Sequence, residues 1–248
     1  MTCKNCGENF GGNFCSKCGQ KAKVDRINAK YVLAEIPETF FQINHGLLFS
    51  IKELFLRPGK TIREYLEGKR KNYIKPIAYV LLLSTLYALL AKLITGSTFL
   101  GEIALGMAEG GTSSESDPVL SSTLNWVANN HAYSMVLFLP FFSFASFLAF
   151  KKYNFNFFEH FVLNAYLCGQ QAIIFSFFLI VQHTGNIEFY YFPTIPLCIS
   201  IGYAFWTFIQ FFNSTSKISS FGRSLITYFI YFIIIVVSFV IVFIINIV

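Results

Sequence analysis

Five long apolar runs after residue 76 constrain the fold more than any other feature of the chain. A helix needs about 20 mostly apolar residues to cross a bilayer. Five stretches meet this requirement, at residues 77–94, 132–150, 161–181, 192–212 and 225–248. Of the 248 residues, 54% are hydrophobic and only 13% are charged, which is unusual for a soluble globular domain. We therefore predict an all-α polytopic membrane protein with five transmembrane helices.

The distribution of charge predicts how these helices are oriented. Of the 19 Lys and Arg residues, 14 lie at or before Lys75. The connections at residues 96–130 and 182–191 contain acidic residues but no Lys or Arg, whereas cations follow the second and fourth runs. Because cytoplasmic loops carry the excess of cations, we predict a cytoplasmic N-terminus and a C-terminus outside.

A basic junction stands immediately before the first apolar run. It consists of four cations with Tyr73 among them: Lys69, Arg70, Lys71 and Lys75. Cations and an aromatic ring at this position are typical of the cytoplasmic edge of a first transmembrane helix. We expect these four side chains to fix the orientation of the chain and to contact anionic lipid headgroups.

The N-terminal segment contains four cysteines in the pattern C-x2-C-x8-C-x2-C, namely Cys3, Cys6, Cys15 and Cys18. Each two-residue gap lets two thiolates converge on one metal ion, and the glycine after each pair permits the tight turn of a knuckle. This spacing predicts a structural Zn²⁺ site with a closed coordination sphere. Two disulfides would require an oxidising compartment, and iron remains open as an alternative metal.

The chain thus divides into a zinc-knuckle segment at residues 1–20, a basic linker with amphipathic interfacial helices at 21–76, and a five-helix transmembrane domain at 77–248. Apolar residues recur at helical spacing between Phe40 and Phe55, interrupted by polar side chains. We expect this helix to lie along the cytoplasmic face, in the headgroup boundary or packed on the bundle, with burial on a partner protein as the alternative. The Gly- and Ser-rich loop at residues 106–122 is expected to be flexible.

The third apolar run carries a polar pattern. His160, Asn164 and Gln171 fall on one helical face, with Glu159 on a neighbouring one. These four residues form a candidate intramembrane site, either a substrate or proton path or a lipid-headgroup site. Asn and Gln also serve as hydrogen-bonding contacts between helices, and we favour this structural role or lipid contact because no other span carries a deep ionisable partner.

Three motifs together carry a resemblance to a known family: CKNCGENFGGNFCSKCGQ, RPGKTIREYLEGKRKNYIKP and FFEHFVLNAYL. The chain resembles, over essentially its whole length, the bacterial family named domain of unknown function 3667. The resemblance implies a multi-pass protein of the bacterial cytoplasmic (inner) membrane with no established activity. The five spans after an Arg-Pro-Gly turn are also similar, more loosely and in architecture only, to the Yip family of membrane proteins, which implies a general membrane-organising or partner-recruiting role.

These observations lead to two functional hypotheses. The first is a non-enzymatic anchor or adaptor whose zinc knuckles recruit a cytoplasmic or membrane protein partner. The second is a small transporter or lipid-handling protein that uses the polar face of the third transmembrane helix. We expect no enzymatic activity, because no phosphate-binding loop, nucleophile elbow or acid pair is present. We expect no nucleic-acid binding, because the cations form no continuous face; membrane lipids are expected partners and a homo-oligomer remains open.

Overall fold

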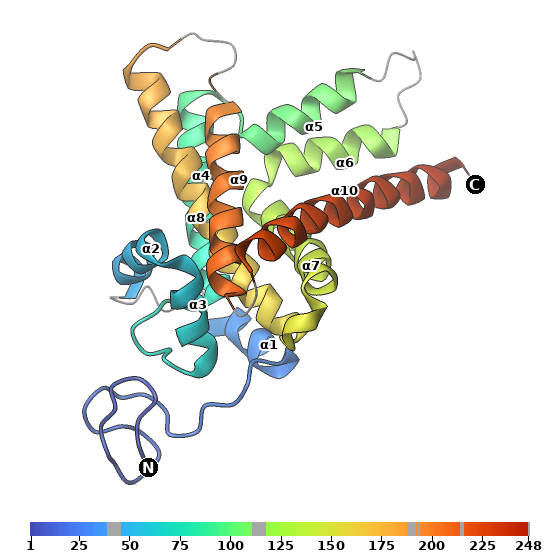
Figure 1. The fold of residues 1–248 in the computed structure, drawn as a ribbon. Coiled ribbons are helices and arrows are strands. Elements are labelled where there is room, and N and C mark those ends of the chain that lie inside the picture. The colour runs from blue at the N-terminus through green and yellow to red at the C-terminus, as the bar shows by residue number, and fades with distance from the viewer. Residues whose placement is uncertain (39–45, 111–117, 188–191, 193, 214–215, 248) are drawn as a thin grey trace.

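The computed structural model describes residues 1–248 except 39–45, 111–117, 188–191, 193, 214–215 and 248. Ten α-helices and one short 3-10 turn, Lys151–Tyr153, make up the regular structure of this part of the chain. Within the described residues, β-type backbone pairing is limited to two isolated antiparallel bridges near the N-terminus, Thr2 with Asn9 and Phe14 with Lys21. The all-helical prediction is therefore confirmed (Figure 1).

Five helices are long and apolar enough to cross a membrane, as predicted. Two of them begin at least four residues before the apolar runs that predicted them. The third span begins at Phe157, because Asn156 caps the helix there. The fifth begins at Lys217, where Ser216 Oγ accepts a 3.2 Å hydrogen bond from the Ser219 N–H in the first turn. The five helices are α4 (Pro76–Ile94), α7 (His131–Ala149), α8 (Phe157–Thr184), α9 (Thr194–Phe211) and α10 (Lys217–Ile247).

The centre of the bundle is the long contact between α4 and α8. Gly169 of α8 permits this close packing, since a Cβ atom there would overlap the ring of Tyr79 on α4. Tyr79 in turn donates a hydrogen bond to the Oε1 atom of Gln170. Around this pair, α7 contacts α4, α8 and α10, while α9 contacts α8 and α10. The end of the bundle where α8 begins is packed with aromatic rings, including the stacked pair Phe150 and Phe212 with centroids 3.9 Å apart.

The connection between α4 and α7 contains two helices, α5 (Phe99–Gly110) and α6 (Pro118–Asn129), which pack against each other. The prediction of a flexible loop at residues 106–122 is therefore wrong where these helices extend into it, and residues 111–117 lie outside the described part. Ala104, Leu124 and Val127 form a small buried cluster between the two helices. Burial of these apolar side chains outweighs the low helix propensity of the Gly and Ser residues.

Three shorter helices precede the bundle: α1 (Ala29–Glu38), α2 (Gly46–Leu56) and α3 (Pro58–Glu67). Helix α2 contains the described part of the predicted amphipathic helix, of which residues 40–45 lie outside the described residues. It packs on the bundle, where the backbone carbonyls of Ile51 and Leu54 accept hydrogen bonds from Gln170 and Tyr203. Helix α1 was not predicted.

The Arg-Pro-Gly turn positions α3 against α9. Pro58 occupies the first turn of α3, where its missing N–H leaves no helical hydrogen bond unmade. The N–H of Gly59 donates a 3.1 Å hydrogen bond to Gln210 Oε1, and a Cβ atom on Gly59 would overlap the backbone nitrogen of Phe211. Arg57 pairs with Glu53 and Glu64, which joins α2 to α3.

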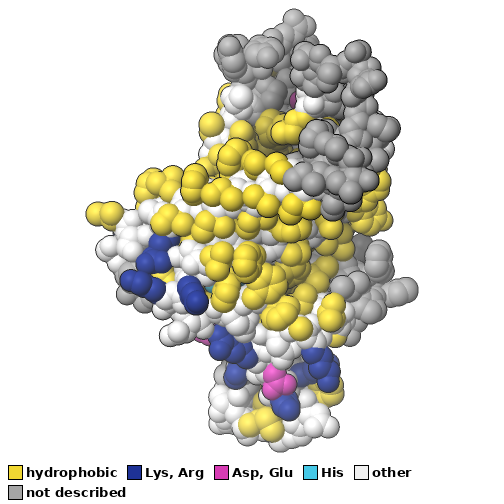
Figure 2. Space-filling view, turned by 90° about the vertical axis from the view of Figure 1, so that its right-hand side faces the viewer, with side chains coloured by type: hydrophobic (Ala, Val, Ile, Leu, Met, Phe, Trp, Pro, Cys, Tyr) yellow, Lys and Arg dark blue, Asp and Glu magenta, His cyan; other side chains and the backbone are white. Residues whose placement is uncertain are grey.

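The surface is divided by polarity. Figure 2 shows hydrophobic side chains covering the middle of one face, with Lys and Arg side chains gathered below them toward the N-terminal segment. Large apolar side chains of the spanning helices are exposed in this structure, among them Leu137, Phe229 and Phe232. An apolar band of this kind above a basic region is typical of a protein embedded in a bilayer.

Candidate metal centre and its attachment to the bundle

The two cysteine pairs adopt the same local conformation. In the first knuckle, Cys3 N–H donates to Glu8 O at 2.8 Å and Gly7 N–H donates to Cys3 O at 2.9 Å. The second knuckle repeats this pattern with Cys15, Gln20 and Gly19. Gly7 and Gly19 have φ angles of 76° and 71°, a conformation that glycine adopts without steric penalty. The glycine that follows each cysteine pair is therefore required by the turn.

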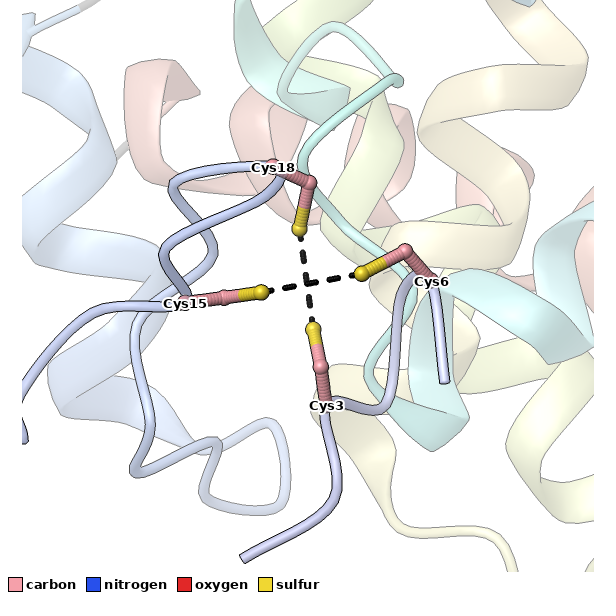
Figure 3. Close-up of side chains that lie close together, drawn as sticks. All are labelled: Cys3, Cys6, Cys15 and Cys18. Carbon is pink, nitrogen blue, oxygen red and sulfur yellow. Dashed lines mark hydrogen bonds between the residues drawn. The ribbon is translucent and has the colours of Figure 1, made fainter. Parts of the chain in front are cut away.

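The four sulfur atoms point toward a common centre (Figure 3). The Sγ atoms of Cys3 and Cys18 are 3.6 Å apart, as are those of Cys6 and Cys15, and all four lie within 4.8 Å of one another. Metal–sulfur bonds of about 2.3 Å in a tetrahedron separate the sulfurs by about 3.8 Å. The four cysteines could therefore bind one metal ion, and within the described residues they are the one group of His, Cys, Asp and Glu side chains with this geometry.

The thiols of Cys3 and Cys6 have pKa shifts of opposite direction. Burial raises the pKa of Cys3, but hydrogen bonds from the backbone of Cys6 and Asn5 and from neighbouring sulfurs outweigh it and lower this pKa to about 7. A backbone hydrogen bond at Glu8 lowers the pKa of Cys6, whereas burial and the other three sulfurs raise it to about 12. Without a cation, the Cys6 thiol would therefore stay protonated near neutral pH. A metal ion would hold all four as thiolates.

The cysteine segment is attached to the junction before the first spanning helix. Gln20, which follows the second knuckle, is buried and donates a 3.1 Å hydrogen bond from Nε2 to the carbonyl of Gly68. Gly68 ends α3 with a φ angle of 118°, and the side chains of Lys4 and Val24 fill the space where a Cβ atom would lie. The Gln of the CGQ sequence therefore docks the metal centre on the end of α3.

A second attachment joins the linker to α8. Arg26 Nε donates to Glu159 Oε1 and Arg26 Nη2 donates to Glu159 Oε2, both at 2.7 Å. Glu159 also completes the helix cap, because its carboxylate accepts from Asn156 N–H at 2.8 Å while Asn156 Oδ1 accepts from Glu159 N–H at 2.9 Å. Asn156 Nδ2 donates to Ile27 O at 3.0 Å. The start of α8 thus holds the linker through both a salt bridge and a backbone contact.

The cations of the basic junction differ in their surroundings. Arg70 is engaged within the protein, since it donates to Asp25 O at 2.9 Å and lies 4.6 Å from the ring centroid of Tyr31. Lys69 pairs with Glu64 at 3.4 Å. Lys71 is exposed and its side chain passes close to Gly19, while Lys75 is partly buried. Lys71 is therefore the junction cation most accessible to lipid headgroups or partners.

The predicted polar residues of α8 do not form one site. His160 Nδ1 lies 3.0 Å from Ser146 Oγ, and Asn164 Nδ2 donates to the same oxygen at 2.9 Å. These contacts join α8 to α7. Gln171 lies further along the helix, where its Nε2 donates to Ser200 O of α9 at 3.2 Å. Each of these side chains makes a contact between helices, and Glu159 serves the attachment of the linker instead.

Sequence reasoning missed the partners of Glu159 and Gln20. Both contacts join segments that are far apart in the chain, Arg26 with Glu159 and Gln20 with Gly68. The spacing of Asn156 and Glu159 before an apolar run was a capping signal that could have placed Glu159 at a helix start rather than within a membrane path.

Comparison with known proteins gives one match. Residues 45–88 match the family described as "Protein of unknown function (DUF3667)". This match supports membership in that family, as the sequence motifs led us to expect. The matched stretch holds α2, α3, the basic junction and most of α4, so it covers the surface on which the metal centre docks. No curated protein and no solved structure matches the chain.

Proposed function

We propose that the chain is a non-enzymatic membrane anchor whose N-terminal module, folded around zinc, recruits a cytoplasmic protein partner. The attachment of the module carries this proposal. Gln20 and Arg26 fix the module and its linker to the inner end of the bundle through Gly68 and Glu159. A fixed module presents its surface with less loss of conformational freedom on binding than a free tail would.

The surface of the module suits an interaction. Phe14 lies between the two knuckles and is 58% exposed, and Met1 is 66% exposed. An aromatic side chain exposed on so small a module is a good anchor residue for a protein partner. Lys21 forms a backbone bridge with Phe14, and Lys4, Lys17 and Lys21 are exposed cations of the same small module, which favours a partner with an acidic face.

Zinc suits the proposed role because four thiolates leave no open coordination position for a substrate. The segment has too few residues to bury a hydrophobic core, so metal binding would supply its folding free energy. We place the module in the cytoplasm of a bacterial cell and the C-terminus outside, since the cations gather at the end of the bundle that carries the module.

The alternative of a small transporter or lipid-handling protein has less support from the polar face of α8. Glu159 is engaged by Arg26, and His160 and Asn164 contact Ser146. These contacts favour a structural role for the three residues. Gln171 differs from them because it also lines a cavity within the bundle.

Site-specific photocrosslinking in native membranes tests the recruitment proposal. A benzophenone amino acid at Phe14 should give one defined protein adduct. The adduct should disappear when Cys15→Ser prevents closure of the metal site, and persist in the control Cys198→Ser, which changes an exposed cysteine of α9. The same probe at the apolar, exposed Leu137 should not capture that protein. An adduct that is unchanged in Cys15→Ser, or no adduct at Phe14, would contradict recruitment by the folded module.

A further inference from the structure

A cavity of about 370 Å³ lies between the spanning helices, well away from the metal centre. Side chains from α4, α5, α7, α8, α9 and α10 line it, so it is formed by the bundle as a whole. Most of the lining is apolar, with Leu139, Phe142 and Phe175 among the larger side chains. Its volume falls within the usual range of ligand sites, about 300 to 1,000 Å³.

Three residues that line this cavity have a buried side-chain polar atom without a hydrogen-bond partner among the described residues. Among the described residues, six buried side-chain polar atoms lack a hydrogen bond, and Ser84 Oγ, His131 Nδ1 and Ser200 Oγ are three of them. All three residues line the cavity, and each comes from a different helix: α4, α7 and α9. A buried polar group without a hydrogen-bond partner destabilises the folded state, so its presence calls for an explanation. A ligand that forms hydrogen bonds with these three side chains would explain why they are buried without a partner in the protein.

The lining defines the chemistry of such a ligand. No Asp, Glu, Lys or Arg occurs among the residues that the structure places around the cavity. A charged headgroup would therefore be buried without a counter-charge, which is strongly unfavourable. The serine hydroxyls both donate and accept hydrogen bonds, and an imidazole nitrogen does either according to its tautomer. The complementary molecule has a hydrocarbon body and an uncharged hydroxyl or carbonyl group.

The wall formed by α10 offers access from the membrane. Tyr228 and Tyr231 of α10 line the cavity. The apolar window of α10 is 17% buried, against 39–44% for the other four spans, so few side chains cover its outer face. Ile103 of α5, also at the cavity, is 42% exposed. A molecule dissolved in the bilayer would therefore have a short path past these residues.

We infer that this cavity binds an uncharged single-chain lipid, with the polar end of the lipid hydrogen-bonded among Ser84, His131 and Ser200. Gln171 positions Ser200 by its hydrogen bond to the Ser200 carbonyl. This site is independent of the metal module and of the recruitment role. It gives the membrane helices a binding capacity of their own.

Photolabelling of the purified full-length protein in nanodiscs tests this inference. The probe is hexadecanol carrying a diazirine in its chain. We expect saturable labelling, with adducts on cavity residues of α8 and α9 such as Ala172 or Ile201. Unlabelled hexadecanol should compete, and hexadecyl phosphate should compete at least tenfold more weakly. Labelling that does not saturate, adducts confined to lipid-facing residues such as Phe229, or equal competition by the phosphate would each overturn the inference.

Two sets of variants sharpen the test. Ser200→Trp fills the cavity and should reduce saturable labelling at least tenfold, whereas Leu86→Trp, on the exposed face of α4, should leave it unchanged. The double variant Ser84→Ala, Ser200→Ala removes the two hydroxyls of the cavity. Competition by unlabelled hexadecanol should become about tenfold weaker in this variant. Labelling by a hexadecane that carries a diazirine should stay unchanged, because this probe has no hydroxyl group. Wild-type labelling in a correctly folded Ser200→Trp variant would contradict the inference. If that variant does not fold, the adduct positions in the wild-type protein decide.

Discussion

Arg26 and Glu159 form a two-point salt bridge that joins the linker after the metal centre to the start of the third spanning helix, with both N–O distances 2.7 Å. Glu159 is almost fully buried whereas Arg26 is 61% exposed at its side chain. The pair therefore lies at the boundary between the N-terminal segment and the bundle. It gives the Glu of the FFEHF sequence a structural contact with the linker.

Replacement of Glu159 tests this attachment. Glu159→Gln keeps a side chain that can complete the helix cap but removes the charge that holds Arg26. We expect the free energy that holds the linker on the bundle to fall by about 1 kcal/mol. This value is small for a charged hydrogen bond because Arg26 is solvent-exposed. Hydrogen exchange of residues 22–28 should become faster. The control Glu67→Gln changes an exposed acid and should have no effect on this segment; equal exchange in both variants would argue against the attachment.

Metal content provides a direct test of the cysteine site. Purified protein should contain about one metal ion per chain, and the double variant Cys15→Ser, Cys18→Ser should contain almost none. Cys168→Ser, outside the cluster, should retain the metal. Inductively coupled plasma mass spectrometry gives both the amount and the element, so iron in place of zinc would be recognised. As the pH falls the metal should be released, because protons compete for the thiolates; metal retained by the double variant would contradict the assignment.

Gly59→Ala should destabilise the contact between α3 and α9. The new methyl group would overlap the backbone nitrogen of Phe211, and backbone cannot move aside as a side chain can. We expect the free energy of unfolding to fall by about 1–3 kcal/mol, which lowers the midpoint of thermal unfolding. Gly106→Ala serves as the control, because Gly106 is also helical and open space surrounds the position of its Cβ. Equal midpoints for the two variants would show that α3 and α9 do not approach so closely.

Gly169→Ala should loosen the packing of α8 on α4. Its methyl group would meet the ring of Tyr79, which is held in place by its hydrogen bond to Gln170. Gly202→Ala, in α9 with no neighbouring atoms, is the matched control and should be tolerated. Adding Tyr79→Leu to Gly169→Ala should recover part of the lost thermal stability, because the two side chains share one space. If the effects of the two substitutions on thermal stability simply add in the double variant, the result would contradict this contact.

Orientation can be tested with a membrane-impermeant maleimide on intact cells, in a variant lacking Cys198. A cysteine introduced at Ser97, between α4 and α5, should react from outside. A cysteine at Asn213, an exposed position after α9, should react only after the cells are permeabilised. The expected pattern follows from Lys217 and Arg223, which come after α9, and from the lack of Lys and Arg at residues 96–130 between α4 and α7. The reverse pattern would place the metal centre outside the cytoplasm.

The spanning helices and the metal ligands could be predicted because each depends on local sequence. An apolar run of sufficient length has few alternatives to a membrane helix, and the spacing of Cys3, Cys6, Cys15 and Cys18 brings the sulfurs together with little help from the rest of the chain. Helix α2 was also predicted from its apolar periodicity.

The features that were missed depend on long-range packing. Helices α5 and α6 are stabilised by mutual burial of Ala104, Leu124 and Val127, which the Gly and Ser content of the loop concealed. The polar lining of the cavity comes from single residues on separate helices, Ser84, His131 and Ser200, so no spacing pattern marks it. The partner of Glu159 lies 133 residues away, beyond the reach of any local signal.

The two attachments of the linker impose an order on biosynthesis. Gly68 and Arg70, which hold Gln20 and Asp25, are translated soon after the cysteine segment. Asn156 and Glu159 emerge from the ribosome only after the first two spanning helices have been made. The metal centre can therefore fold early on the basic junction, but the linker reaches its final position only once the third helix begins. This salt bridge can therefore form only after residues 1–158 have been made, so the linker is the last part of the N-terminal region to be fixed in place.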